Sequence, residues 1–431
     1  MTAGVDGRAE SEVAGGLYDV AVVGGGPAGA TAARVAARAG ARVCLLERAD
    51  LPRYKTCGGG IVGISADTAG IDLGPLEKGK IDTVTFTLDG RFPVTRGCRH
   101  RRPILSMVMR DEFDAALCAA AREAGAQIRP RSVVTSVTQE GTGLVSLAIR
   151  GAADVRARVV VGADGTAGRT GTHVGVRCDQ VDLGLEGEFP VGGRLAARWA
   201  NRVLLDWGPV PGSYAWLFPK GDVLTVGVIG AKDQAPALRA YYADLIDRLG
   251  LGGVTPRHDT GHLTRVRAPG SPLRRGGVIV AGDAAGLLDP WTREGISFAL
   301  RSGRIAGEAA AAAVADGPAA LAAYPDRIEQ VLGPEQAAGR RVLAVYARHP
   351  EVMHAVMAAV PGGFGLFERI ISGRSTVARQ LRRPMVGAVA TVLAGRPGAA
   401  GPVRAHPDRP SGPTPDEREP GEREPATSSG G

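Results

Sequence analysis

Cysteine is scarce in this chain, and the five cysteines are scattered at positions 44, 57, 98, 118 and 178. They form no C-x-x-C pair and have no spacing typical of a metal site, so we predict neither a disulfide framework nor a bound metal. Residues 1–16 are small, polar and acidic and do not resemble a signal peptide. We therefore expect reduced thiols and a cytoplasmic protein.

Long apolar runs and aromatic residues are also scarce. No stretch approaches about 18 uninterrupted apolar residues, which argues against a transmembrane helix. Aromatic residues make up 4% of the chain, so a cluster of them carries weight. The formal net charge of +8 is moderate, and no basic stripe is interleaved with aromatic residues, so we expect no nucleic-acid partner. The charge is compatible with anionic ligands or an anionic membrane surface.

The strongest pattern that is present lies between residues 17 and 48. A short apolar run at 20–23 (VAVV) predicts a buried parallel strand. Glycines follow in the spacing G-x-G-x-x-G at 24–29, then an Ala-rich helix from about 30 to 39, and a second strand at 43–46 before Glu47. Together they form a βαβ unit with an acid at the spacing typical of dinucleotide-binding folds.

Each part of this unit has a physical role in binding a nucleotide. Gly24 permits a tight turn, Gly26 lets the backbone approach a pyrophosphate, and Gly29 allows close packing of helix on strand. The free N–H groups at the helix start favour the pyrophosphate anion. Glu47 can accept hydrogen bonds from ribose hydroxyls, which favours FAD or NAD over NADP. The alternative is a glycine-rich turn in an unrelated α/β protein, which the register of strand, helix and acid disfavours.

Two later apolar strands also end in glycine and an acid. The run 158–162 leads into Asp164, and the run 277–281 leads into Gly282 and Asp283. At each of these ends the backbone can reach a bound cofactor. Residues 292–296 (TREGI) then open a long Ala-rich helix, whose N–H groups could point at a flavin pyrimidine ring, where negative charge develops on reduction.

Two further segments are candidates for a substrate site. A loop at 51–61 carries three consecutive glycines beside Cys57 and can approach a planar ligand; the alternative is a flexible surface loop. Residues 214–220 (YAWLFPK) alternate so that Tyr214, Trp216 and Phe218 share one face of an extended segment. An ordinary sheet core is the alternative here, and periodicity alone does not separate the two.

The remaining segments give coarser predictions. We expect a hairpin at 81–95, a helix after Arg110, and a solvated basic loop at 96–102, with a phosphate or membrane contact as the alternative for that loop. The region 318–394 is helical and ends in an apolar helix at 385–393, which we interpret as a docking helix rather than a membrane contact. The composition from residue 395 onward predicts disorder.

The three strand-end motifs, in this order, resemble the glutathione-reductase-type FAD fold of the para-hydroxybenzoate hydroxylase superfamily over about residues 17–310. Within that range, the loop KTCGGG at 55–60 and Y-x-W-x-F-P-K at 214–220 resemble the geranylgeranyl reductase family. That family reduces carbon–carbon double bonds of prenyl chains, and its aromatic motif lies near the isoprenoid channel. Two positions depart from the family pattern: Arg293 stands where glycine is common, and Thr166 begins a segment that lacks the usual serine.

The resemblance implies a fold class and a domain organisation. We expect an α/β protein with a glutathione-reductase-type FAD-binding Rossmann domain, an inserted β-rich substrate domain and a helical C-terminal region. The predicted parts are a disordered N-terminus (1–16), the FAD-binding domain (17–65, 103–180 and 262–317), the substrate-binding domain (66–102 and 181–261), the helical region (318–394) and a disordered tail (395–431).

The resemblance also implies a set of site residues. Arg110 should lie near the FAD phosphates, Asp283 near the ribityl chain and pyrophosphate, and Gly295 with Ile296 at the flavin O2 edge. The expected cofactor-binding residues are Gly24, Gly26, Pro27, Ala28, Gly29, Glu47, Arg48, Arg110, Asp164, Gly282, Asp283, Gly295 and Ile296. The expected catalytic residues are Cys57, Tyr214 and Trp216, and the expected substrate-binding residues are Gly58, Gly59, Tyr214, Trp216 and Phe218.

The implied reaction is the saturation of a prenyl double bond by hydride from reduced FAD, with NADPH or NADH as the external electron donor. The carbon that becomes electron-poor would be shielded by Tyr214 and Trp216, whereas Cys57 could contact the reacting face or relay a proton. The expected partner is a prenylated small molecule or lipid, with a peripheral location on the inner face of the membrane as an option. The substrate, the number of bonds reduced and the oligomeric state stay open.

Four alternatives use the same fold. A flavin monooxygenase or halogenase is one, since the segment 214–219 faintly resembles a halogenase aromatic motif. An electron-transfer flavoprotein:quinone oxidoreductase would need four cysteines for its cluster, and no cysteine follows Cys178. A non-redox flavin cyclase and a non-enzymatic prenyl-binding protein are the others; the second would be colourless.

Overall fold

The computed structural model describes residues 16–99 and 103–395. These residues fall within one compact unit, Met1–Pro397. The predicted disordered termini, apart from Gly16 and Gly395, lie outside the described residues, as do three residues of the basic run at 96–102. None of the helices in the two described ranges is both long and apolar enough to cross a bilayer.

An eight-stranded, mostly parallel sheet forms the first layer, in the order β17-β18-β11-β1-β2-β8, with β10 and β9 continuing from β11. Its parallel strands are rich in valine and leucine because both of their faces are buried. They end at the same edge, so the segments that follow them meet there. The strands are β1 (Leu17–Val23), β2 (Val43–Leu46), β8 (Gln127–Arg129), β9 (Val134–Gln139), β10 (Val145–Ile149), β11 (Val155–Gly162), β17 (Arg274–Arg275) and β18 (Val278–Val280).

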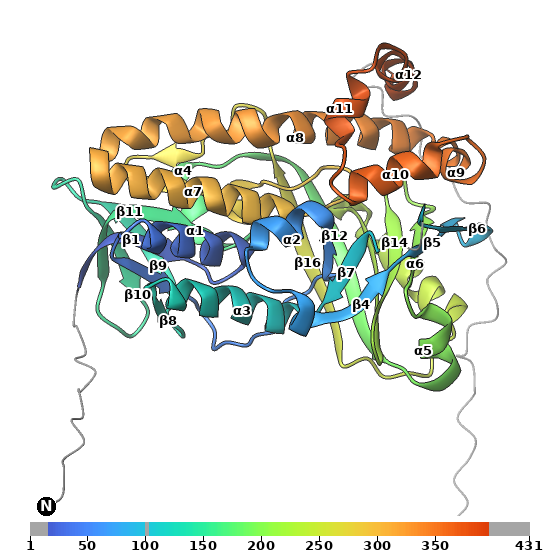
Figure 1. Cartoon of the computed structure of the whole chain (residues 1–431), viewed down its shortest axis with the longest axis horizontal. Coiled ribbons are helices and arrows are strands. Elements are labelled where there is room, and N and C mark those ends of the chain that lie inside the picture. The colour runs from blue at the N-terminus through green and yellow to red at the C-terminus, as the bar shows by residue number, and fades with distance from the viewer. Residues whose placement is uncertain (1–15, 100–102, 396–431) are drawn as a thin grey trace, which may run out of the picture. The chain divides into compact units, whose positions relative to one another are not determined.

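Two Ala-rich helices, α1 (Pro27–Arg38) and α7 (Ile296–Asp316), cover this sheet and pack against each other (Figure 1). Small residues permit the contact: a Cβ on Gly303 would lie 2.3 Å from the carbonyl oxygen of Ala28. Helix α1 starts three residues before the predicted residue 30, because Pro27 fits the first helical turn. Helix α3 (Arg110–Glu123) packs against α1 and β8, and α4 (Arg169–Val174) against β9 and β18.

A seven-stranded sheet, in the order β16-β12-β15-β14-β13-β5-β6, forms the second large layer. The predicted hairpin at 81–95 is present as β5 and β6, with Asp89 and Gly90 at its turn. One face of the sheet packs Ala215 and Leu217 against α6 (Ala235–Arg248). The strands are β5 (Thr83–Leu88), β6 (Arg91–Gly97), β12 (Cys178–Pro190), β13 (Arg202–Trp207), β14 (Tyr214–Lys220), β15 (Val223–Ala231) and β16 (His258–Arg267), and α5 (Gly193–Trp199) precedes β13.

A small sheet and short helices connect the two layers. The small sheet consists of β3 (Gly60–Val62), β7 (Leu105–Val108) and β4 (Glu77–Ile81), in the order β3-β7-β4. The short helices are α2 (Gly63–Ala69), η1 (Gly74–Leu76), η3 (Lys232–Gln234), η4 (Gly282–Ala285) and η5 (Pro318–Ala323). Strands β12 and β16 of the second sheet cross the boundaries predicted at 180/181 and 261/262, and the domain boundaries stay a prediction.

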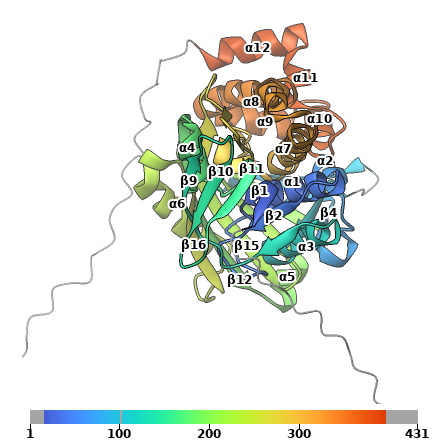
Figure 2. The same ribbon diagram turned by 90° about the vertical axis from the view of Figure 1, so that its left-hand side faces the viewer.

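The predicted C-terminal helical region is present as α8 (Tyr324–Arg348), α9 (Pro350–Ala358), α10 (Gly363–Ile371), α11 (Val377–Leu381) and α12 (Pro384–Ala394). Helix α8 runs along α7, and α12 lies beyond α8 and α11 in both views (Figures 1 and 2). Although α12 contacts α8, it buries none of its residues, and Met385 and Val392 are 83% and 79% exposed. The helix therefore contacts its neighbours, as the docking prediction expects, but these contacts leave its apolar side chains exposed.

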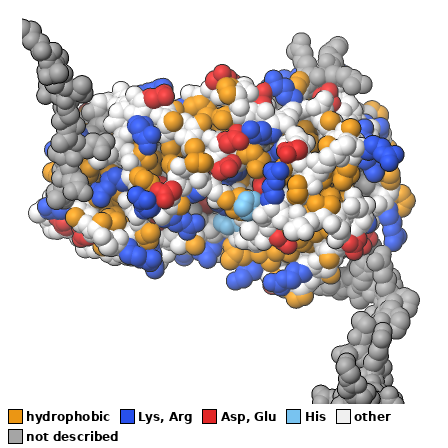
Figure 3. Space-filling view, turned by 90° about the horizontal axis from the view of Figure 1, so that it is seen from below, with side chains coloured by type: hydrophobic (Ala, Val, Ile, Leu, Met, Phe, Trp, Pro, Cys, Tyr) orange, Lys and Arg blue, Asp and Glu red, His pale blue; other side chains and the backbone are white. Residues whose placement is uncertain are grey.

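Acidic, basic and hydrophobic side chains are interspersed on the face shown in Figure 3. The positively charged side chains therefore do not form a single basic patch on that face.

Candidate active site

A cavity of about 610 Å³ lies between the ends of the parallel strands and the face of the seven-stranded sheet that is opposite to α6. Of the predicted site residues, Gly29 and Gly282 lie beneath its wall, and all the others line it. Those that line it are Gly24, Gly26, Pro27, Ala28, Glu47, Arg48, Cys57, Gly58, Gly59, Arg110, Asp164, Tyr214, Trp216, Phe218, Asp283, Gly295 and Ile296. Segments from separate parts of the chain are thus brought to one space.

The glycine loop after β1 closes one end of the cavity. Gly24 has a φ of +104°, and a Cβ there would lie 2.3 Å from the carbonyl oxygen of Ala163. A Cβ on Gly29 would lie 1.9 Å from the carbonyl oxygen of Gly24. Gly26, by contrast, faces open space, its nearest side-chain neighbour being Arg53. The loop is therefore tightly packed beneath and open on the cavity side, as a pyrophosphate requires.

Buried carboxylates organise the basic residues at this end. Glu47 accepts a hydrogen bond of 2.8 Å from the Gly25 N–H and lies 3.3 Å from the guanidinium of Arg53. The fully buried Asp114 accepts two hydrogen bonds of 2.9 Å from Arg110 and one of 3.1 Å from Arg53. Burial alone would lower the pKa of Arg110, but Asp114 and Cys57 together outweigh burial, and the pKa is raised. Two guanidinium groups are thus held in fixed positions beside the cavity.

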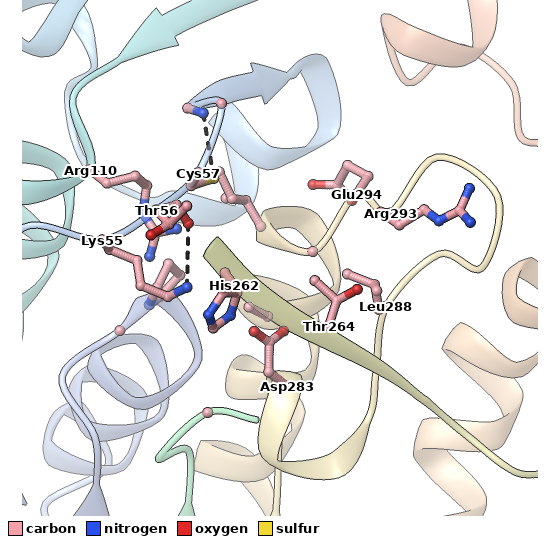
Figure 4. A pocket seen from close by; sticks show the side chains of 18 of the residues that line it. Lys55, Thr56, Cys57, Arg110, His262, Thr264, Asp283, Leu288, Arg293 and Glu294 are labelled. Carbon is pink, nitrogen blue, oxygen red and sulfur yellow. Dashed lines mark hydrogen bonds between the residues drawn. The ribbon is translucent and has the colours of Figure 1, made fainter. Parts of the chain in front are cut away.

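Asp164 and Asp283 come from the two later strand ends, and their environments differ. The Asp164 carboxylate accepts hydrogen bonds from the N–H groups of Arg169 and Thr170, at 2.6 and 3.1 Å, and so caps α4. It stabilises the loop that lines the cavity. Asp283 lies within the cavity, where Lys55 and His262 point toward it (Figure 4).

Lys55 and His262 were not among the predicted site residues. The pKa of Lys55 is lowered by burial and then by Arg110, and the pKa of His262 is lowered to about 4 by burial and then by Lys55. His262 is therefore neutral near pH 7. Lys55 belongs to the glycine-rich loop and could have been included, whereas His262 lies on β16 with no motif around it.

The glycine-rich loop rests directly on the aromatic strand. A Cβ on Gly58 would lie 2.7 Å from the ring of Phe218 and 3.4 Å from Nε1 of Trp216. The Cys57 N–H donates a 2.8 Å hydrogen bond to Oε1 of Glu186 on β12, and the Cys57 sulfur accepts one of 3.4 Å from the Gly59 N–H. The loop can therefore lie against the aromatic rings because its glycines have no side chains.

The predicted alternation of β14 is confirmed: Tyr214, Trp216 and Phe218 line the cavity, whereas Ala215 and Leu217 pack on α6. The ring centroids of Tyr214 and Trp216 are 5.9 Å apart, and those of Trp216 and Phe218 are 6.4 Å apart. Beyond them the cavity wall is apolar and includes two residues of helix α10. The apolar lining consists of Ile81, Val84, Ile104, Leu105, Val203, Leu205, Trp207, Phe367 and Ile371.

The loop before α7, where the sequence departs from the family pattern, is anchored to this wall. Arg293 adopts a φ of +54° and forms a 3.1 Å ion pair with Asp182 of β12; the two side chains are only 3% and 2% exposed. Its guanidinium lies 5.9 Å from the Tyr214 ring, and the Tyr214 hydroxyl donates to the carbonyl oxygen of Thr292. Arg293, which stands where the family commonly has glycine, thus links the loop before α7 to β12 and to the aromatic strand β14.

The start of α7 reaches the cavity at Gly295 and Ile296, but it is not entirely free. Oε1 of Glu294 accepts a 2.6 Å hydrogen bond from the Ser297 N–H. Burial raises the pKa of Glu294 to about 7. One of the N–H groups expected to face a flavin is therefore already bonded within the chain.

The comparisons with known proteins agree with this arrangement. The FAD binding domain family matches residues 17–187. Digeranylgeranylglycerophospholipid reductase 1 of Methanopyrus kandleri is 31% identical over 339 residues, which cover 73% of this chain and 86% of the relative. The chain belongs to the geranylgeranyl reductase family of FAD-dependent oxidoreductases.

Solved structures of the same fold have more than one activity. A geranylgeranyl bacteriochlorophyll reductase-like protein from Thermoplasma acidophilum has a TM-score of 0.70 and 23% identity, covering 88% of this chain and 99% of that one. A flavin-dependent brominase has a TM-score of 0.67 and 20% identity, covering 87% and 99%. The predicted fold class is confirmed, and at these identities the likeness to both solved structures concerns the fold alone.

Proposed function

We propose that this protein saturates carbon–carbon double bonds of a prenyl chain. One observation carries the proposal: within a single cavity, the glycine-rich loop with Cys57 touches Trp216 and Phe218 at the junction of a polar end and an apolar end. A nucleotide needs the first end and an isoprenoid chain needs the second. The reacting groups of both would meet at this junction.

The polar end fits FAD. Gly26 leaves an open cradle at the start of α1. Glu47 lies after β2, where it would bind the adenosine ribose, and Arg110 and Arg53 lie near enough to bind the phosphates. FAD in its reduced form would supply the hydride, and we propose NADPH or NADH as the source of its electrons.

The chain's own residues would then prepare the alkene. An isolated alkene accepts hydride poorly unless a proton reaches its other carbon, and the carbon left electron-poor must be kept from water. The ring faces of Tyr214 and Trp216 carry negative charge density suited to that carbon. The apolar lining beyond them, including Val84 and Leu205, would hold the rest of the chain. The relative from Methanopyrus kandleri is named for a prenylated glycerophospholipid, and we propose a prenylated lipid for this protein too.

An anaerobic single-turnover experiment tests this proposal. Protein reduced with dithionite is mixed with a panel of prenyl alcohols, diphosphates and lipids, and the expected product gains two hydrogens per saturated bond. Trp216→Leu should slow the reaction by about 30-fold, because a desolvated cation–π contact contributes about 2 kcal/mol. The control is Trp199→Leu, since Trp199 is buried in the core on the other face of the sheet. Unchanged substrates across the panel would contradict the proposal.

An oxygen-dependent activity is the second candidate, because the brominase shares the fold at a TM-score of 0.67. The same protein, given candidate substrate, NADPH or NADH, oxygen and halide, would then yield hydroxylated or halogenated product. Such a product in place of the saturated one would favour this candidate.

We also propose that α12 contacts an anionic membrane surface. The helix has no charged residue, exposes Met385, Val389 and Val392, and follows Arg382 and Arg383. Apolar side chains beside arginines suit the interface of an anionic bilayer. Sedimentation with vesicles of anionic lipid should bring down the protein, and Val389→Asp should abolish this while leaving FAD binding unchanged. Equal sedimentation of the variant would contradict the proposal.

A further inference from the structure

Glu186 lies next to the aromatic residues across the seven-stranded sheet. Strand register pairs Glu186 of β12 with Gly227 of β15, and Gly227 with Trp216 of β14, so all three face the same side. Because Gly227 has no side chain, the indole of Trp216 covers it: a Cβ there would lie 2.3 Å from the ring. The carboxyl group and the indole are therefore neighbours on the wall of the cavity.

One oxygen of this carboxyl group has a partner and the other does not. Oε1 accepts the hydrogen bond from the Cys57 N–H, whereas Oε2 has no hydrogen-bond partner among the described residues. The residue is only 1% exposed, yet it lines the cavity. A buried oxygen without a partner is costly, and a catalytic role is one of the explanations for such a group.

The surroundings of Glu186 allow it to hold a proton. Burial raises its pKa to about 7, and the charge of Lys220 opposes that shift. Lys220 is itself buried, 3.8 Å from Glu188. The titratable groups that face Glu186 are Lys220, Glu188, Lys55, Cys57, Tyr54 and Tyr242.

We propose that Glu186 is the proton donor of the alkene reduction, acting through Oε2; this rests on the proposed function. The O–H bond of the carboxylic acid breaks and a C–H bond forms at one alkene carbon. The hydride that reduced FAD supplies joins the other carbon, so the alkene gains two electrons and two hydrogens. The carboxylate left behind lies near the positive charge of Lys220 and regains its proton from water.

This assignment separates two roles in the glycine-rich loop. Even with its pKa raised to about 7, the Glu186 carboxyl group is a stronger acid than a thiol with a reference pKa of roughly 8.5. Cys57 would orient the acid through its backbone N–H rather than donate from sulfur. Replacing the Cys57 thiol by a hydroxyl should then affect turnover much less than a change at Glu186.

Glu186→Gln is the decisive variant, because its amide oxygen can still accept the Cys57 N–H while the acidic proton is gone. FAD binding and flavin reduction should be unchanged, and single-turnover oxidation of the reduced flavin by the alkene should slow by about 100-fold or more. In the unaltered protein this rate should fall as pH rises through about 7, since the acid form is required, and the variant should lose that dependence. A rate within about 3-fold of the unaltered protein would overturn the proposal.

A second measurement, the infrared difference spectrum of unaltered protein minus Glu186→Gln, does not depend on turnover. Both proteins are in the oxidised FAD form. The spectrum should contain a protonated carboxyl band at about pH 6 that is replaced by a carboxylate band at about pH 8. Glu308→Gln, which removes an exposed carboxyl group of α7 outside the cavity lining, should keep both the band and the alkene reaction.

The two measurements distinguish the two proposals. If the unaltered protein saturates no prenyl substrate, the reductase function fails, and the infrared band still reports whether Glu186 holds a proton in the cavity. A carboxylate band already present at about pH 6 would overturn the role of Glu186, whatever the substrate panel gives.

Discussion

The two ends of the cavity are built in different ways. The nucleotide end is made of backbone, from glycines and helix starts that follow the strands of one parallel sheet, as at Gly24 and Gly29. The apolar end is made of side chains, from alternate residues of strands in the other sheet, such as Trp216 and Leu205. The first is fixed by close contacts that admit no extra atom, and the second by the size and polarity of individual residues.

This difference predicts how each end responds to substitution. A changed side chain at the apolar end alters what the cavity binds, whereas an added atom at the nucleotide end displaces backbone. Damage at the nucleotide end should therefore remove the cofactor and destabilise the fold, and damage at the apolar end should leave a yellow protein with altered chemistry.

The largest effect should come from Gly29→Ala. Its Cβ would lie 1.9 Å from the carbonyl oxygen of Gly24, so the helix and the loop must separate. We expect loss of bound FAD and a free energy of unfolding lower by about 4 kcal/mol or more, measured by flavin absorbance and urea unfolding. Gly141→Ala is the control, since nothing lies within 4 Å of its Cβ. A Gly29→Ala protein that remains yellow and stable would show that the nucleotide end is not fixed by backbone packing.

A smaller effect should come from breaking the buried ion pair that joins the loop before α7 to the second sheet. Asp182→Ala would leave the Arg293 guanidinium buried without its carboxylate and should lower the free energy of unfolding by about 3 kcal/mol. Asp179→Ala, on the same strand, removes the carboxylate that pairs with Arg340 in a more exposed position and should cost less than about 1 kcal/mol. Because Asp182 contacts the loop before α7 and not the glycine cradle, FAD affinity should change less than prenyl turnover. Equal losses from the two variants would contradict this account.

The same difference explains what could be predicted from the sequence. The βαβ unit, the three strand ends and the alternation of Tyr214, Trp216 and Phe218 are all local patterns, so they could be identified before the structure was known. Glu186 could not, because its hydrogen bond to Cys57 joins residues 129 positions apart. The contribution of Phe367 to the cavity was missed for the same reason, since it comes from a helical region predicted to lie apart from the substrate domain.

Asp182 and His262 show a further limit of the sequence. Both are polar residues on strands of the second sheet, and each is turned inward, Asp182 buried and His262 partly buried. Alternation predicts which residues share a face of a strand but not what that face will cover. That is decided by how the second sheet packs against the first.

The smallest predicted effect concerns Glu294, at the start of α7. Its pKa is about 7 in the folded protein, against roughly 4.3 for an ordinary carboxyl group in an unfolded chain. Between these values the folded state holds a proton that the unfolded state has lost, so the free energy of unfolding must fall as pH rises from about 4 to about 7. In Glu294→Gln, the difference in the free energy of unfolding between about pH 5 and about pH 7.5, measured with urea, should be smaller by on the order of 2 kcal/mol.

The unaltered protein is the necessary reference for this measurement, because other buried groups titrate in the same range. Glu186 contributes a slope of the same sign, and His262, whose pKa is lowered to about 4, contributes one of the opposite sign. Both are present in the Glu294→Gln variant, so their contributions cancel in the difference. A variant with the same pH dependence as the unaltered protein would mean that Glu294 is ionised when folded, and its hydrogen bond to Ser297 would then be that of a charged helix cap.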